Sequence, residues 1–270
     1  MKETLLTILI ILFLLLSCKA DKINKNHDFH KNPVIAHRGA WKNTGHPQNS
    51  LPSLKAAIEM GCHGSELDVQ LTKDDSLIVY HDLKHHGMVI DSTAYAELIK
   101  IPLKNGDKIP TLREYLAEGI KQSKTKLIID IKTPKNKTRT ARSASKILET
   151  IKELQAETWV EFLASDPDAI RLLLENTSLP VAYLGLWKNE IAEMEPENVC
   201  NMGVKHIDYQ DIHYKNNAGW IDIFKEKGIH LNVWTVNSAE DMNYFLSKDF
   251  NYITTDEPEL LLNLINNKQK

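Results

Sequence analysis

Short apolar runs alternate along this chain with segments whose apolar residues recur every three to four positions. The short runs predict buried strands, and the segments with the longer spacing predict amphipathic helices. Strands are predicted at 32–39, 65–72, 76–82, 126–133, 159–165, 181–186, 205–210, 229–237 and 252–256. Helices are predicted at 51–60, 111–122, 138–155, 166–176, 190–202, 219–228, 238–248 and after residue 256.

The order of these elements indicates the fold class. The segments 65–72 and 76–82 are separated by a few polar residues, which predicts an antiparallel hairpin. The other strands alternate with helices, which favours parallel βαβ units. We therefore predict an α/β fold, a (β/α)8 TIM barrel with a small hairpin excursion after the second strand. An open doubly wound sheet is the alternative, and it is disfavoured because no Gly-rich phosphate loop follows the first strand.

Two local features refine this prediction. Ser50 has the character of a helix N-cap, and Gly61 follows the last apolar position of that helix, so the helix is predicted to start and end there. A two-residue turn at Asp74 and Asp75 would place His81 opposite Asp68 in the hairpin.

The composition is that of a folded globular protein, with 42% hydrophobic and 26% charged residues in 270. The formal net charge is −3, so the chain has no basic excess of the kind that nucleic-acid binding requires. We expect no nucleic-acid partner, and nothing in the sequence indicates a protein partner.

The first residues differ from the rest. Lys2 is followed by an apolar run, 5–16, that is shorter than the ~20 residues of a membrane span and resembles a secretory signal. The sequence LLSC, ending at Cys18, resembles the lipobox of bacterial lipoproteins, in which the cysteine carries the lipid. A plain signal peptide or an uncleaved anchor is the alternative.

This interpretation predicts the domain organisation and the location. The predicted parts are a lipoprotein signal peptide (1–17), a tether (18–31) and one barrel domain (32–270). The mature protein would be exported and held by a lipid on Cys18 at a membrane, as a periplasmic or cell-surface lipoprotein. Cys62 and Cys200 precede strands on different sides of the barrel, so we expect two free thiols.

Polar residues gather where the predicted strands end, which is where TIM barrels carry their active sites. These residues are His37, Arg38, Glu66, Asp68, Asp130, Lys132, Ser165, Trp234 and Asn237. Successive side chains of a strand point to opposite faces, so Glu66 and Asp68 project the same way. The hairpin returns His81 towards them.

These residue types together point to phosphoryl chemistry. Glu66, Asp68 and Asp130 are oxygen donors suited to a hard cation such as Ca²⁺ or Mg²⁺. Arg38 and Lys132 would attract an anionic substrate. His37 and His81 would supply an acid and a base near neutral pH.

Each residue also has a structural interpretation. The carboxylates could be a platform for salt bridges to the two cationic side chains, and either histidine could be structural. We group Trp234 with the substrate-binding residues, with packing at the rim as its alternative.

Several segments of the sequence, spread over essentially the whole mature chain, resemble the glycerophosphodiester phosphodiesterase family. HRGAWKNTGHPQNS resembles the family's His-Arg-Gly and Pro-Glu-Asn-Thr/Ser opening, and ELDVQLTKDDSLIVYHD resembles its Glu-x-Asp-Val and His-Asp pattern. IPTLREYL, IDIK, NVWTVN and ITTDEP resemble later landmarks in the same order.

The resemblance implies a (β/α)8 barrel with a divalent ion, Ca²⁺ or Mg²⁺, that hydrolyses glycerophosphodiesters to glycerol 3-phosphate and an alcohol. It implies that His37 and His81 are the general acid and base, that Glu66 and Asp68 bind the metal, and that Arg38 and Lys132 hold the phosphate. Gln48 and Asp130 depart from the family pattern, which usually has Glu at both positions.

Two other functions remain open at this point. One is a phospholipase D-like action on lysophospholipids, which a membrane anchor would favour. The other is a non-catalytic lipoprotein that binds glycerophosphodiesters, which the departures at Gln48 and Asp130 would favour.

Overall fold

The structure is a computed structural model that describes residues 27–134, 138–188, 191–192 and 195–268. Its strands are β1 (Val34–Ala36), β2 (Gly64–Leu71), β3 (Leu77–Val79), β4 (Lys84–His85), β5 (Met88–Val89), β6 (Lys126–Ile131), β7 (Val160–Ala164), β8 (Val181–Gly185), β9 (Trp187–Lys188), β10 (Ile191–Ala192), β11 (His206–Gln210), β12 (His230–Trp234) and β13 (Tyr252–Thr255). Its helices are α2 (Leu51–Glu59), α3 (Tyr95–Leu98), α4 (Leu112–Gly119), α5 (Thr138–Leu154), α6 (Pro167–Asn176), α7 (Pro196–Asn201), α8 (Asp211–Asn216), α9 (Gly219–Glu226), α10 (Ala239–Ser247) and α11 (Pro258–Lys268), with a 3-10 turn η1 (Ile90–Ser92).

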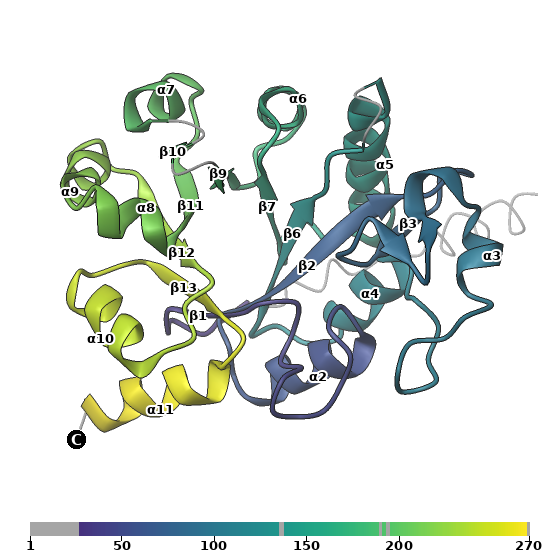
Figure 1. Ribbon diagram of the computed structural model, residues 1–270, viewed down its shortest axis with the longest axis horizontal. Coiled ribbons are helices and arrows are strands. Elements are labelled where there is room, and N and C mark those ends of the chain that lie inside the picture. Colours follow the sequence, from purple (N-terminus) through teal and green to yellow (C-terminus); the bar gives the residue numbers. More distant parts are fainter. Residues whose placement is uncertain (1–26, 135–137, 189–190, 193–194, 269–270) are drawn as a thin grey trace, which may run out of the picture.

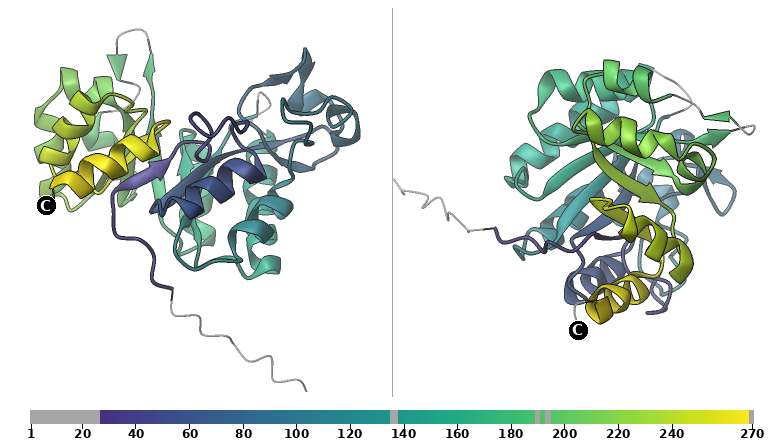
Figure 2. Two further views of the ribbon diagram at one scale, coloured as in Figure 1. Left: turned by 90° about the horizontal axis from the view of Figure 1, so that it is seen from below. Right: turned by 90° about the vertical axis from the view of Figure 1, so that its left-hand side faces the viewer.

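The parallel strands form a closed barrel with the helices outside it (Figure 1). The order around the barrel is β1, β13, β12, β11, β8, β7, β6 and β2, and β1 also pairs with β2. Figure 2 shows α11, the last helix, beside β1, the first strand. The predicted (β/α)8 barrel is therefore confirmed, and β3 is the antiparallel hairpin excursion on β2.

Strand β2 is fully buried although half of its residues are polar. Every residue of β2 is buried. Leu67 and Val69 face outward and belong to the main hydrophobic core beneath the helices. Glu66 and Asp68 alternate with them and face the interior of the barrel, because side chains of a strand alternate between faces. The barrel interior is thus the place to which the polar face of this strand is directed.

Capping residues set the helix boundaries. Ser50 caps α2 through a capping box with Ser53, and Met60 is its C-cap, so the predicted N-cap is confirmed. Thr111 caps α4 in the same way with Glu114. The region before β11 differs from the prediction, because the short strands β9 and β10 precede a helix α7 that starts only at Pro196. Strands β4 and β5 and helices α3 and α8 were not predicted.

The register of the β2–β3 hairpin differs by one residue from the prediction. Val69 pairs with Val79 and Leu71 with Leu77, so Tyr80, not His81, lies opposite Asp68, and its N–H donates to the Asp68 carbonyl at 2.9 Å. The predicted two-residue turn is wrong. The Thr72 N–H donates to the Ser76 carbonyl at 3.0 Å, which leaves a loop of three residues whose last member, Asp75, has a φ of 59°. A left-handed residue at the end of a three-residue loop is a common hairpin geometry.

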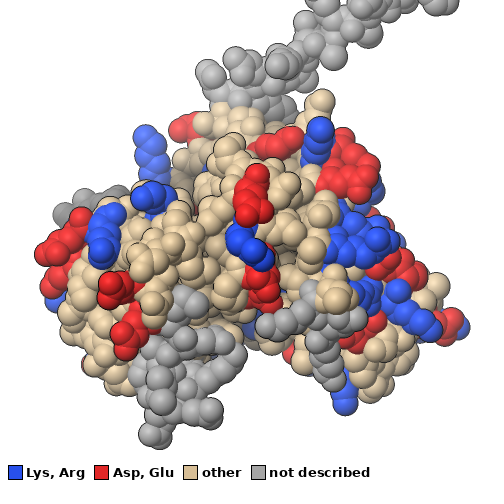
Figure 3. All heavy atoms as spheres, turned by 90° about the horizontal axis from the view of Figure 1, so that it is seen from above, with Lys and Arg blue, Asp and Glu red and all other residues tan. Residues whose placement is uncertain are grey.

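Ion pairs hold this hairpin against helix α5. The Asp75 carboxylate at the turn lies 2.9 Å from Arg139 Nη2 and 2.5 Å from Arg142 Nη2, and both arginines belong to α5. Elsewhere on the surface, Lys and Arg side chains are interspersed with Asp and Glu, as the face in Figure 3 shows.

The first described residues lie at the N-terminal end of the barrel. The N–H of His30 donates to the carbonyl of Lys124 at 2.8 Å, just before β6 begins, and Asp28 pairs with the Lys124 ammonium at 2.8 Å. The predicted signal peptide, Cys18 and most of the predicted tether lie outside the described residues. Within the described ranges, none of the helices has the length and apolar character needed to cross a membrane. Cys62 and Cys200 are free thiols, as predicted.

Gly185 tests the packing between the neighbouring strands β8 and β11. A Cβ at this position of β8 would overlap the ring of the buried Tyr209 on β11. We expect Gly185→Ala to lower the free energy of unfolding by about 1–3 kcal/mol, measured by urea denaturation, because an overfilled core must shift its neighbours.

Gly219→Ala on α9 is the matched control, since a Cβ there meets nothing within 4 Å. It should leave stability unchanged or raise it by up to about 1 kcal/mol. Equal stability of the two variants would show that Tyr209 can move away from position 185 at little cost in free energy.

Candidate active site

A cavity of about 440 Å³ opens at the C-terminal end of the barrel strands. The predicted site residues that line it are His37, Arg38, Glu66, Asp68, His81, Asp130, Lys132 and Trp234, whereas Asn237, a further strand-end residue, does not line it. Ser165 also lines it. Cys18, the predicted lipidation site, lies outside the described residues. The structure therefore brings the predicted site residues together from five strands and one hairpin.

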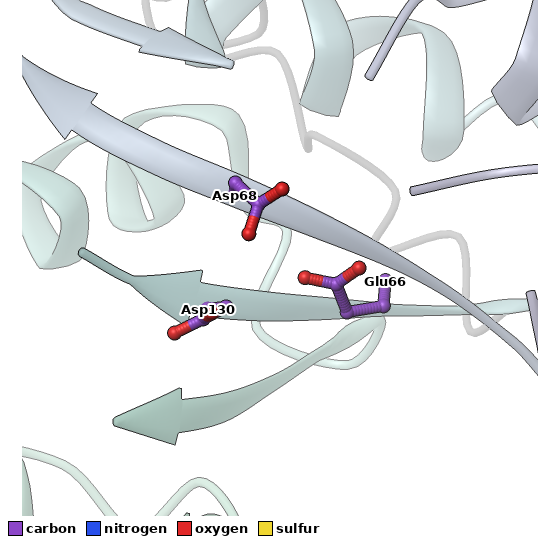
Figure 4. Close-up of side chains that lie close together, drawn as sticks. All are labelled: Glu66, Asp68 and Asp130. Atoms are coloured by element: carbon purple, nitrogen blue, oxygen red, sulfur yellow. The ribbon is translucent and has the colours of Figure 1, made fainter. Parts of the chain in front are cut away.

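Three buried carboxylates form the most charged part of this cavity. Asp68 on β2 and Asp130 on β6 are direct partners in the parallel register, and Glu66 lies two residues before Asp68. One oxygen of each carboxylate lies within 4.8 Å of the others, and Figure 4 shows the three groups gathered between the two strands. The sheet register thus places three like charges in one buried volume.

Two cationic side chains compensate part of this charge. The Lys132 ammonium lies 2.7 Å from Asp68 Oδ1 and 2.5 Å from Asp130 Oδ2. The Arg38 Nε lies 3.2 Å from Asp68 Oδ2. Burial acts to raise the pKa of Asp68, but Lys132 and Arg38 outweigh it and lower that pKa to about 2. Burial also acts against the charge of Lys132, but the carboxylates around it raise its pKa above the ordinary value.

The compensation is incomplete at the other two carboxylates. Burial, together with the charges of Asp68 and Asp130, raises the pKa of Glu66 well above its ordinary value. Burial also raises the pKa of Asp130. An additional cation at this place would remove the repulsion and favour the ionised form of all three groups.

The donor set fits a hard divalent cation. Two oxygens bound to one Ca²⁺ at 2.3–2.6 Å lie at most about 5 Å apart, and the three carboxylates meet that condition. All three offer oxygen, which Ca²⁺ and Mg²⁺ prefer. Asp130 contributes to the cluster although it is one methylene shorter than the glutamate that the family usually has there.

Both histidines are held through Nδ1 by a carboxylate. His37 Nδ1 lies 2.8 Å from Asp256 Oδ1, and His81 Nδ1 lies 2.8 Å from Asp82 Oδ1. Burial is the main reason why the pKa of each histidine is lowered. Since Nδ1 of each ring is engaged by a carboxylate, Nε2 is the nitrogen left for exchanging a proton with a bound molecule.

The sequence analysis missed two residues that position these groups. Asn49 donates to Asp68 Oδ2 at 2.7 Å and accepts from the Asp68 N–H at 3.0 Å. Asp256, which orients His37, is itself held by the Asn237 amide at 2.9 Å. Asp256 directly follows the last barrel strand, so the strand-end rule could have identified it. The role of Asn49 depends on its backbone φ of 58°, which the sequence does not show.

The loop after β1 orients Arg38. Its backbone, at a φ of 59°, directs the N–H to Glu66 Oε2 at 2.9 Å. Its guanidinium also donates to Gln48 Oε1 at 2.6 Å. A side-chain oxygen at position 48 therefore still reaches Arg38, although the glutamate usual in the family is replaced by glutamine.

The rest of the cavity is lined mainly by apolar groups. Leu163, Leu184 and Leu186 come from β7, β8 and the residue after β8. The Trp234 indole N–H donates to the backbone carbonyl of Asp208 at 3.1 Å, which fixes the ring beside them. The cavity thus has one charged wall and one apolar wall.

Comparison with known proteins identifies the family. The model of the glycerophosphoryl diester phosphodiesterase family matches residues 37–260. A glycerophosphodiester phosphodiesterase from Caldanaerobacter subterraneus subsp. tengcongensis is 31% identical over 249 residues, which are 87% of this chain and 98% of that relative.

Solved structures agree with this match. A crystal structure of a glycerophosphodiester phosphodiesterase from Parabacteroides distasonis is similar at a TM-score of 0.83 with 32% identity, over 90% of this chain and all of that one. A phosphodiesterase from Oleispira antarctica, solved with the product sn-glycerol-3-phosphate, shares the fold at a TM-score of 0.74 and 18% identity, over 87% of this chain and 97% of that one. The chain therefore belongs to the glycerophosphoryl diester phosphodiesterase family and is a phosphoric diester hydrolase.

Proposed function

We propose that the enzyme hydrolyses glycerophosphodiesters to glycerol 3-phosphate and an alcohol, with a divalent cation bound by Glu66, Asp68 and Asp130. The observation that carries this proposal is the presence of three carboxylates, two cationic side chains and two histidines in one cavity. The glycerol 3-phosphate bound to the Oleispira antarctica phosphodiesterase, which shares this fold, supports the same product.

The charged wall explains how a phosphodiester would bind. Arg38 and Lys132 present donors to phosphoryl oxygens and would stabilise the negative charge that grows on them during the reaction. A bound Ca²⁺ or Mg²⁺ would supply further positive charge against the same oxygens. Asn49 keeps Asp68 in place through its paired hydrogen bonds.

The two histidines would move the protons. One neutral imidazole accepts a proton from the attacking water as the water oxygen forms a bond to phosphorus. The other, in its protonated form, donates a proton to the leaving oxygen as the bond between phosphorus and the alcohol breaks. Asp256 and Asp82 hold the rings through Nδ1 and would stabilise their protonated forms.

We also propose the location and the domain organisation that the sequence predicts. In this proposal the signal peptide is 1–17, the tether 18–31 and the barrel domain 32–270, and a lipid on Cys18 holds the exported enzyme at a membrane in the periplasm or at the cell surface. The supporting observation is the short apolar run before LLSC.

Chelation tests the metal site. We expect EDTA to abolish hydrolysis of glycerophosphocholine, and Ca²⁺ or Mg²⁺ to restore it. Asp68→Asn should abolish metal-dependent turnover and weaken cation binding measured by calorimetry, because it removes one charged ligand and almost no volume.

Asp222→Asn, which changes an exposed carboxylate of α9, is the control and should behave like the wild type. Full turnover after chelation, or in Asp68→Asn, would mean that the cluster has another role.

The histidines are tested by substitution with alanine. His37→Ala and His81→Ala should each lower turnover about 10²–10⁴-fold, the usual contribution of an acid or base. Their effects should not multiply fully in the double variant if the two rings act as one unit. His230→Ala, at the opposite end of β12, is the control and should retain turnover.

A nitrophenyl diester assigns the two roles, because its leaving group needs no proton. It should restore turnover in the variant that lacks the acid and leave the other impaired. Wild-type turnover of glycerophosphocholine by either alanine variant would contradict the assignment.

The anchor is tested by Cys18→Ser. This variant should leave the membrane fraction and keep its specific activity on glycerophosphocholine, because position 18 precedes the barrel domain. Fractionation with ultracentrifugation and immunoblotting gives the readout. A Cys18→Ser protein that stays with membranes would show that another segment retains it there.

A further inference from the structure

Asp208 is a buried carboxyl group inside the barrel that the proposed mechanism does not use. It lies in the middle of β11, between Leu184 of β8 and Asn232 of β12 in the parallel register. Ile207 and Tyr209 on either side belong to the outer core, so Asp208 faces the interior. It lines the active-site cavity and is 1% exposed.

One oxygen of this carboxyl group has no hydrogen-bond partner among the described residues. Throughout the part of the chain that the structure describes, no donor or acceptor pairs with Asp208 Oδ1. A buried polar atom without a partner costs about 1–3 kcal/mol, and native proteins keep few of them. The absence of a partner is explained if the partner is a bound molecule.

The surroundings of Asp208 restrict what that molecule can be. Burial, and to a lesser degree Asp130, raises the pKa of Asp208 well above its ordinary value, which favours a neutral carboxyl that can both donate and accept. Leu163, Leu184 and Trp234 form the apolar wall around it. This combination suits a small molecule with hydroxyl groups and a short carbon skeleton.

The proposed substrate has such a part at one end. A glycerophosphodiester carries a three-carbon glycerol unit with two free hydroxyls, next to the phosphate that the charged wall would hold. Its C–H groups can pack on the leucines and the indole. Its hydroxyls need polar partners, because an unpaired hydroxyl in an apolar pocket weakens binding.

The leaving alcohol has a different place available. A second cavity, of about 710 Å³, lies beside the first, and His81 lines both. Trp41, Tyr80, Leu103 and Lys104 are among its lining residues. This wider space can take alcohols of different size, which leaves the cavity with Asp208 for the constant glycerol unit.

We propose that Asp208 is a specificity-determining residue that hydrogen-bonds a free hydroxyl of the glycerol unit and so distinguishes glycerophosphodiesters from diesters without that hydroxyl. This inference rests on the proposed function of the cavity.

Competitive inhibition by two phosphate monoesters tests it. Glycerol 3-phosphate carries the hydroxyls, and propyl phosphate has the same carbon skeleton without them. In the wild type, glycerol 3-phosphate should bind more tightly than propyl phosphate. Asp208→Leu should reduce this ratio of inhibition constants about 10–100-fold, with the constant for propyl phosphate unchanged.

Two further variants keep the test decisive. Asp208→Asn has similar volume and retains a donor and an acceptor, so it should preserve most of the ratio. If Asp208→Leu does not fold, Asp208→Ala removes the same carboxyl with less steric demand and should show the same loss of the ratio. Asp211→Asn, on the outer helix α8, is the control and should match the wild type.

The outcomes separate the two proposals. An unchanged ratio in Asp208→Leu or Asp208→Ala, or an equal loss for both inhibitors, would overturn the role of Asp208 while the wild type still hydrolysed glycerophosphocholine. A wild-type enzyme that did not hydrolyse glycerophosphocholine would overturn the proposed function, and this inference with it.

Discussion

Charge compensation around Asp68 is the constraint on which the active site depends. A charge buried as deeply as this carboxylate is tolerated only when it is paired and hydrogen-bonded. Lys132 meets that need from the end of β6, and Arg38 and Asn49 meet it from the loop between β1 and α2. Both segments follow strands that pair with β2, so Asp68 is contacted from each side of its own strand.

This constraint also explains the backbone of the loop after β1. Arg38 and Asn49 both adopt positive φ values, which are uncommon for residues other than glycine. Those conformations let the loop direct a guanidinium, an amide and a backbone N–H at the carboxylates of β2. Strain of this kind persists where surrounding contacts determine the conformation, and binding sites are where it concentrates.

The alternation of polar and apolar residues was sufficient to predict the barrel and most of the cavity. Leu67 and Val69 indicate the outer face of β2, so Glu66 and Asp68 must face inward, and the strand-end rule adds His37, Asp130 and Trp234. The register of the hairpin could not be predicted, because it depends on the left-handed conformation of Asp75.

Some partners of the site residues could also not be predicted from the sequence. Asn49 lies 19 positions from the carboxylate that it holds. Alternation with Ile207 and Tyr209 directs Asp208 inward, but only the arrangement of β8, β11 and β12 shows that it lines the cavity. Such contacts depend on which distant segments meet in the fold, and the spacing of apolar and polar residues does not indicate that.

The contact between His37 and Asp256 spans 219 positions and crosses the seam between the first and the last barrel strand. The imidazole is therefore oriented only after β13 has joined β1. Contacts between such distant segments slow folding, because the chain must close a long loop before it gains them. Completion of the barrel and maturation of the active site are thus a single event, and a partly folded chain would be an inactive one.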